Sequence, residues 1–345
     1  MSILEAEGIP LHEVKHVRNP KKRRRGPGIH PPLACAFLLL LAALLTLAWQ
    51  RLSEPPGIDR QRIVLYDAGT QTLRTLTLGD YLTGVVAAEM PALYHEEALR
   101  AQAVAARTRA VASMRRLGGT GCAAHPGADI CGDSAHCQAW MDDPALRRRW
   151  GADYAAHLRK ITDAVQSTRG EVMTYGGEPI EVLYHAVSGG ATENVEHVFS
   201  EALPYLRGVE SPGEEGAARY QSEQRFAQQA AAEALNAAFP GAGLSAEGLP
   251  GALAVLGRFD SGRADRVRVG ALTVPATAFR RALGLLSTNF TLAFEGEELV
   301  IRQRGYGHGV GMSQAGADAL ARAGWGYADI LRHYYTGIEL QVTSY

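Results

Sequence analysis

The stretch that says most about this chain reads YLTGVVAAEMP, from Tyr81 to Pro91. It is apolar at nearly every position, and at helical spacing Tyr81, Val85 and Glu89 share one face. Pro91 ends such a helix and favours an extended conformation for Met90. The segment therefore predicts a mostly buried helix that carries the Glu89 carboxyl on its last turn.

A buried carboxyl at this position has two explanations. Burial disfavours the charged form, so the pKa of Glu89 should rise, which suits a proton donor that works near neutral pH. Alternatively, Glu89 forms a structural ion pair with Arg107 or Arg109, which lie on the next predicted helix. The segment alone leaves both explanations open.

The composition indicates a globular protein behind a basic, apolar leader. The 345 residues are 46% hydrophobic, and a net charge of −1 gives no overall field that would select nucleic acid. The basic run Lys21–Arg25 precedes 17 uncharged residues, 33–49, and no small-residue cleavage site for a signal peptide follows them. We expect a basic cytoplasmic tail over 1–32, an uncleaved transmembrane helix in the cell membrane over 33–49, a linker over 50–61, and one extracytoplasmic domain over 62–343.

Beyond the linker, helix and strand patterns are mixed without regular βαβ alternation, which predicts the α+β class. An alanine-rich helix is expected over about 96–117 and another helix over about 221–238. Strand patterns occur at 171–175 and 180–184.

The loop over residues 118–138 is rich in glycine, cysteine and histidine. His125, Cys131, His136 and Cys137 can supply four ligands to a tetrahedral zinc ion, with Cys122 as a substitute ligand. A Cys131–Cys137 disulfide is the alternative outside the cytoplasm, and the spacing alone does not decide between them. Four protein ligands would close the shell and make the metal structural.

Two glycine-containing segments indicate places where a ligand can approach the backbone. In the first, a strand with Tyr184 runs into Ser188 and two glycines, although a plain strand-end turn explains this pattern equally well. In the second, glycine occupies every second position around His308, which is either a ligand-facing group or a satisfied core histidine. Ser313 is a good N-cap for the helix that Gln314 begins.

Several motifs follow one another along the chain: Asp80–Pro91, Glu97–Arg109, Ser188–Thr192, Ser261–Arg263, Phe279–Arg280, Leu283–Gly284, Ser287–Phe290, Gly305–Ala317 and Ile330–Tyr335. Together they resemble the stage II sporulation protein D / LytB family over about residues 62–343. The first and last motifs are highly specific. Ala186 and Val187 depart from the pattern, since serine or threonine is usual there.

The resemblance implies a lytic transglycosylase of peptidoglycan, with a substrate groove in one mixed domain. Glu89 matches the family's catalytic glutamate, which acts as acid and then as base and needs no second carboxylate. Tyr184, Ser188, His308 and Gln314 are the residues that we expect in the groove wall.

The same resemblance matches His125, Cys131, His136 and Cys137 to the zinc loop of metal-binding members, which favours zinc over a disulfide. It implies glycan strands stripped of stem peptides as substrate and a cell-wall amidase as partner. A non-catalytic wall-binding activator of an amidase is the main alternative.

A true muramidase and a zinc hydrolase are further alternatives. The muramidase needs a second carboxylate, for which Glu193 and Glu196 are candidates. The zinc hydrolase needs an open metal position.

Overall fold

The computed structural model describes residues 36, 39–40, 57–199 and 201–343. The chain divides into two units, 1–55 and 56–345. The predicted tail, the predicted transmembrane helix and the linker up to residue 56 lie outside the described residues, apart from Ala36, Leu39 and Leu40. No helix within the described part of the chain is long and apolar enough to span a bilayer.

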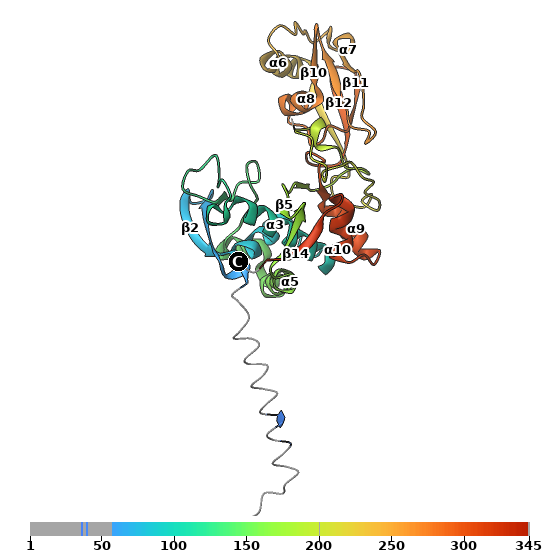
Figure 1. Ribbon diagram of the computed structural model, residues 1–345. Coiled ribbons are helices and arrows are strands. Elements are labelled where there is room, and N and C mark those ends of the chain that lie inside the picture. The colour runs from blue at the N-terminus through green and yellow to red at the C-terminus, as the bar shows by residue number, and fades with distance from the viewer. Residues whose placement is uncertain (1–35, 37–38, 41–56, 200, 344–345) are drawn as a thin grey trace, which may run out of the picture. The chain divides into compact units, whose positions relative to one another are not determined.

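The second unit mixes helices and strands without regular alternation, which confirms the predicted α+β class (Figure 1). In chain order the elements are η1 (Ile58–Arg60), β1 (Arg62–Asp67), β2 (Thr72–Thr77), α2 (Leu78–Glu89), α3 (Glu96–Ser113), η2 (Arg115–Leu117), β3 (Ile130–Cys131), α4 (Asp143–Trp150), η3 (Gly151–Asp153), α5 (Tyr154–Ser167), β4 (Glu171–Tyr175), β5 (Glu178–Pro179), β6 (Tyr184–His185), η4 (Val195–His197), β7 (Gln221–Ala227), α6 (Gln228–Ala238), α7 (Leu249–Ala252), β8 (Leu253–Val255), β9 (Arg266–Val269), β10 (Leu272–Pro275), α8 (Ala276–Leu283), β11 (Phe290–Glu295), β12 (Glu298–Arg304), β13 (Met312–Ser313), α9 (Gln314–Arg322), α10 (Tyr327–Tyr334) and β14 (Glu339–Val342).

The helix that carries Glu89 forms as the sequence predicts. The Thr77 hydroxyl accepts a hydrogen bond from the Asp80 N–H and caps the first turn of α2. Met90, which precedes Pro91, is extended with φ −116° and ψ 145°, so the helix ends at Glu89. The carboxyl is therefore held at the helix terminus, beside the chain that packs against it.

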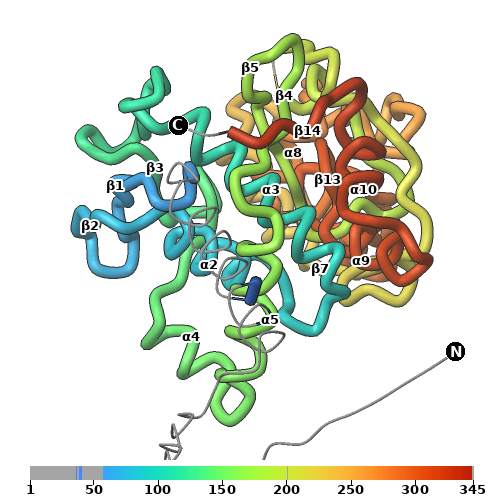
Figure 2. Tube along the Cα trace, turned by 60° about the horizontal axis from the view of Figure 1, so that its bottom comes forward, coloured from blue at the N-terminus to red at the C-terminus, as the bar shows by residue number. Residues whose placement is uncertain are grey.

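The long helix α3 lies at the centre of the first apolar core and contacts α2, α5, α9, α10 and β4. Its alanines are buried, so the neighbouring helices approach closely. The α-helix ends at Ser113, earlier than predicted, and the 3₁₀ turn η2 follows it. The C-terminal strand β14 pairs with β4, which lies between it and β5 (Figure 2).

A second apolar core lies between residues 226 and 301 and contains Phe279, Phe290 and Leu299. It is covered by α6 and α8, and its strands form the sheets β10-β9-β8 and β11-β12-β7.

The structure corrects one predicted helix, because residues 221–227 form strand β7 and only 228–238 are helical. Glutamine, glutamate and arginine favour helix by intrinsic propensity, but β7 alternates exposed and half-buried positions and pairs antiparallel with β12. The predicted strand over 180–184 is likewise reduced to the two-residue strands β5 and β6 at its edges.

Candidate functional site

The Glu89 carboxyl is half-buried and is held by groups from three distant parts of the chain. The Ala139 N–H donates to Oε1 at 2.6 Å, and Gln314 Nε2 lies 3.5 Å from Oε2. The Tyr184 hydroxyl lies near the carboxyl and helps to lower its pKa, while its proton goes to Gln138 Oε1. Burial raises the pKa of Glu89, and these hydrogen bonds, which favour the charged form, offset that rise only in part.

Neither arginine that was considered as a partner neutralises this carboxyl. Arg107 binds both carboxylate oxygens of Asp59, at 2.7 and 2.9 Å, and Arg109 pairs with Glu181. Within residues 57–199 and 201–343, no ion pair includes Glu89. The structural ion-pair explanation is therefore wrong, and the perturbed acid remains.

Gln138 fixes the segment that supplies the Ala139 N–H. Its buried side chain donates from Nε2 to the Tyr81 hydroxyl at 3.0 Å and to the Ala106 carbonyl at 3.4 Å. Its Oε1 accepts the hydroxyl proton of Tyr184 at 2.7 Å. Sequence reasoning missed Gln138 and Ala139, because an amide side chain and a backbone N–H carry no motif of their own.

Gln314 begins α9, where Ser313 caps the helix as predicted. Its amide nitrogen lies between Glu89 Oε2 and Gln102 Oε1, which is 3.3 Å away. Gln102 is fully buried on α3, and its own Nε2 has no hydrogen-bond partner within the described residues. Gln314 and Tyr184 therefore lie beside the carboxyl, and their contact with a ligand stays a prediction.

Ser188 is held inside a polar network, and its place in a groove wall stays a prediction. Its side chain is buried, and its hydroxyl donates to Glu214 at 2.8 Å. The same Glu214 oxygen accepts the N–H groups of Ser188 and Gly189, both at 3.0 Å. The Ser188 carbonyl accepts a hydrogen bond from buried Arg263 at 2.7 Å. Ser188 thus belongs to a buried polar network that fixes the glycine turn.

His308 has both ring nitrogens hydrogen-bonded, as in a satisfied histidine, and its place in a groove wall stays a prediction. Its Nε2–H donates to the Tyr184 carbonyl at 3.0 Å, and its Nδ1 accepts the Val310 N–H at 3.1 Å. Burial, helped by the charges of Arg263 and Arg280, lowers the pKa of His308 to about 4. The neutral ring uses both nitrogens to hold the backbone that follows Tyr184.

The cysteine-rich loop assembles a four-ligand cluster from Cys122, Cys131, His136 and Cys137. Their ligand atoms all lie within 4.8 Å of one another, and the three cysteines are free. His136 Nδ1 lies 3.2 Å from Cys137 Sγ and 3.5 Å from Cys131 Sγ. Three thiolates and one imidazole fit a tetrahedral zinc ion with a closed shell.

The fourth ligand differs from the expected one. Cys122 takes the place that was predicted for His125, whose ring instead stacks on Tyr66 with centroids 3.6 Å apart. A chain reversal between Cys122 and Ala128, closed by a 3.0 Å backbone hydrogen bond, brings Cys122 back to the cluster. Sequence spacing cannot show which residue such a reversal presents.

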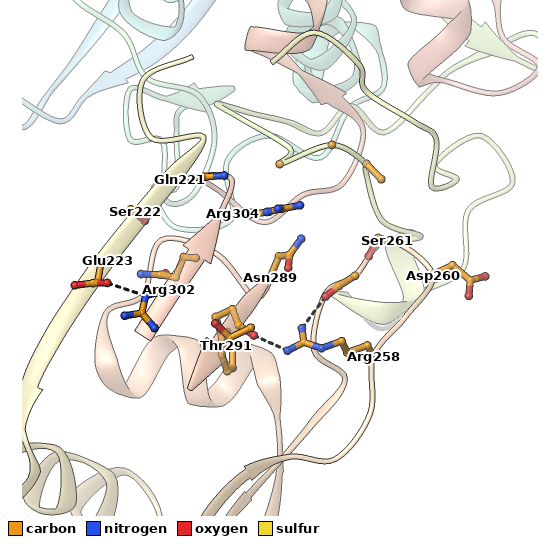
Figure 3. A pocket seen from close by; sticks show the side chains of 16 residues that line it. Gln221, Ser222, Glu223, Arg258, Asp260, Ser261, Asn289, Thr291, Arg302 and Arg304 are labelled. Carbon is orange, nitrogen blue, oxygen red and sulfur yellow. Dashed lines mark hydrogen bonds and ion pairs between the residues drawn. The ribbon is translucent and has the colours of Figure 1, made fainter. Parts of the chain in front are cut away.

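A pocket of about 840 Å³ lies against the sheet β11-β12-β7 (Figure 3). Its walls are the glycine turn 189–191 and the loop 258–262. Glu89 is not among its lining residues.

Comparison with known proteins places these features in a family. The family described as Stage II sporulation protein (SpoIID) matches residues 66–175. Stage II sporulation protein D of Bacillus subtilis (strain 168) is 31% identical over an alignment of 328 residues, gaps included, and the match covers 89% of this chain and 93% of that protein. The chain belongs to the stage II sporulation protein D family.

Two further relatives show the breadth of this family. Stage II sporulation protein D of Bacillus amyloliquefaciens is 33% identical over 279 residues, 81% of this chain and 78% of that protein. A protein named amidase enhancer, from Bacillus subtilis (strain 168), is 28% identical over an alignment of 311 residues, gaps included, and the match covers 76% of this chain and 40% of that protein.

In this family member, the two carboxylates considered for a muramidase are engaged elsewhere. Glu193 is 2% exposed, and its Oε2 accepts the Ser261 hydroxyl proton at 2.5 Å. Glu196 pairs with Arg207. Neither one contacts Glu89 within the described part of the chain.

Proposed function

We propose that this chain is a peptidoglycan lytic transglycosylase that cleaves the bond between N-acetylmuramic acid and N-acetylglucosamine and leaves 1,6-anhydro ends. One observation carries the proposal: the Glu89 carboxyl is half-buried, has no ion-pair partner among the residues that the structure describes, and has a raised pKa. Such a group keeps its proton to a higher pH than an ordinary glutamate and can exchange it with a substrate. Membership of the stage II sporulation protein D family supports a role in cell-wall remodelling during sporulation.

The contacts of the carboxyl assign its two oxygens different tasks. The short hydrogen bond from Ala139 keeps Oε1 as an acceptor, so the proton of neutral Glu89 resides on Oε2. Oε2 donates this proton to the glycosidic oxygen, and the bond between that oxygen and C1 of the muramic acid breaks.

The same carboxyl then completes the reaction as a base. The carboxylate accepts the proton of the 6-hydroxyl while O6 bonds to C1, which closes the anhydro ring and restores neutral Glu89. The reaction consumes no water, so it needs no second carboxylate, in agreement with the engaged states of Glu193 and Glu196.

A zinc ion held by Cys122, Cys131, His136 and Cys137 would be structural, because four protein ligands leave no open position for catalysis. This argues against a zinc hydrolase. The cluster has an indirect part in the chemistry. Cys137 lies two residues before Ala139, so the loop that holds the metal also positions the N–H that binds Glu89.

The experiment incubates full-length protein with glycan strands stripped of stem peptides and identifies the new ends by mass spectrometry. We expect anhydro ends from the wild type and none from Glu89→Gln, which keeps the shape of the side chain but has no proton to exchange. Glu297→Gln, which changes an exposed carboxylate in the turn between β11 and β12, serves as the control and should cleave like the wild type.

The other outcomes each remove the proposal. Reducing ends would show hydrolysis and favour a muramidase. Intact strands that still bind the protein would favour a non-catalytic activator of a cell-wall amidase. That second candidate has specific support in the 28% identity to the amidase enhancer, and stimulation of an amidase by Glu89→Gln would establish it.

The proposal also includes location. The basic run Lys21–Arg25 and the uncharged residues 33–49 support a single-pass anchor in the cell membrane, with a cytoplasmic N-terminus and the domain 62–343 outside. Protease added to intact protoplasts should remove the domain and leave the tail. Protection of the whole chain would contradict this topology.

A further inference from the structure

The polar face of the sheet β11-β12-β7 carries a ladder of neutralised charges. Arg302 pairs with Glu223 at 2.9 Å and with Glu295 at 2.6 Å. Arg225 pairs with Glu223 and Glu295 at 2.8 Å and with Glu298 at 3.0 Å. Each guanidinium on this part of the face therefore has its carboxylates.

Arg304, at the pocket end of the same ladder, has no carboxylate partner within the described residues. It is the last residue of β12, and its cross-strand partner on β7 is Gln221. Its N–H donates to the carbonyl of Asn289, the residue before β11, at 2.8 Å. Its exposed guanidinium has no ion pair or hydrogen bond within residues 57–199 and 201–343. Two amide side chains flank this arginine where the rest of the ladder has glutamates.

Figure 3 shows the side chains of Arg304, Asn289 and Gln221 directed into the pocket. The other charges of the lining do not balance Arg304. Arg258 donates to the carbonyls of Gly262 and Phe290, and Asp260 is turned away from the centre of the pocket. Arg258 therefore has no ion pair either, but its guanidinium is held by two carbonyls, whereas among the described lining residues the guanidinium of Arg304 has neither an ion pair nor a hydrogen bond.

The opposite wall of the pocket is built close to Arg304 and links it to the carboxyl of Glu89. A Cβ on Gly189 would lie 2.9 Å from the carbonyl carbon of Arg304, so only glycine lets this turn approach the end of β12. The turn follows Tyr184, which lies near Glu89. Tyr184, beside the Glu89 carboxyl, and Ser188, at the start of the turn that lines the pocket, are four residues apart. Four residues span at most about 14 Å, so the carboxyl and the pocket lie along one short segment of chain.

We propose that this pocket binds a carboxylate of the substrate through Arg304, with Asn289 and Gln221 as flanking hydrogen-bond donors. A guanidinium beside amides matches the planar, two-oxygen geometry of a carboxylate. This inference rests on the proposed function, since on peptidoglycan the carboxylate is the lactyl group of a muramic acid without its stem peptide. An intact stem replaces that anion by a neutral amide and a peptide chain. The pocket would therefore distinguish stripped strands from intact ones by charge.

The test compares two ligands that differ only in this group. One ligand is stripped glycan strands with free lactyl carboxylates. The other is the same strands with these carboxyls capped as methylamides. Binding is measured calorimetrically on full-length Glu89→Gln protein, so that no strand is cleaved. We expect the free acid to bind about tenfold more tightly than the capped strand, the usual effect of one charge-assisted hydrogen-bonded contact.

Adding Arg304→Gln should abolish this preference and leave the weaker affinity for both ligands. Arg281→Gln, an exposed arginine of α8 outside the pocket, is the matched control and should retain it. Arg304→Lys keeps the charge without the fork and should give an intermediate preference. Because Arg304 is exposed, these variants should fold, and circular dichroism verifies this.

Equal binding of both ligands, or a preference that survives in Arg304→Gln, overturns the inference. The wild-type cleavage assay separates it from the proposed function. Strands that stay uncleaved but are discriminated through Arg304 would remove the enzyme and leave the carboxylate site. If the wild type cleaves the strands but binds free and capped carboxyls equally, the enzyme would stand and the carboxylate site would be removed.

Discussion

Arg107→Met should destabilise the protein strongly, since Arg107 and Asp59 form a buried ion pair. Arg107 is fully buried, and Asp59 is 8% exposed. The guanidinium also donates to the carbonyls of Val165 and Glu171 and approaches the hydroxyl of Thr168 at 3.4 Å. Removing one member of a buried pair costs about 3–5 kcal/mol because the other charge loses its partner. The three further contacts favour the upper part of this range.

The assay is urea denaturation of single and double variants, read as a double-mutant cycle. Arg107→Met and Asp59→Asn should couple by roughly 0.5–3 kcal/mol, because the second change removes the stranded carboxylate. Arg107→Met and Glu89→Gln should instead add within about 0.5 kcal/mol, as expected for groups without a shared contact. Arg281→Gln, an exposed change, should leave the stability nearly unaltered.

The refuting result is specific. If Arg107 coupled to Glu89 and not to Asp59, the Glu89 carboxyl would be one half of a structural ion pair. The raised pKa on which the proposed chemistry depends would then have no basis.

Three further predictions concern the site and its support. Burial raises the folded pKa of Glu89 above 4.5, so the stability of the wild type should fall as the pH rises through that folded pKa. In urea titrations, Glu89→Gln should therefore be more stable than the wild type at pH 7 and should lose this advantage below pH 4.5. Chelation should lower the melting temperature of the protein, and equal melting of the apo and metal-loaded forms would contradict the metal site. By elemental analysis, Cys122→Ser should bind no zinc, while His125→Ala should still bind it. Gly84→Ala should cost about 1–3 kcal/mol in thermal unfolding, because a Cβ there would lie 2.3 Å from Trp140 Nε1, and an unchanged stability would show that the contact is not tight.

The parts of the fold that the sequence predicted are those set by local chemistry. The end of α2 follows from Pro91, and the N-cap of α9 follows from Ser313, since each acts on the next few backbone groups. The strand β7 was mistaken for helix, because its residue types favour helix and its strand character comes from pairing with β12. Propensity is a weak signal where a distant strand supplies the hydrogen bonds.

The candidate site divides along the same line. The sequence by itself marked Glu89 as an acid in an apolar helix. It also predicted three of the four clustered metal ligands and named the fourth, Cys122, as a substitute in the same loop. Only the tertiary structure decided that Arg107 turns to Asp59, that Cys122 completes the cluster, and that Ala139 holds the carboxyl. A charged or polar group binds the groups that lie near it in space. Arg107 and Asp59 are 48 positions apart, and Ala139 and Glu89 are 50 positions apart, so each pair meets only when the domain has packed.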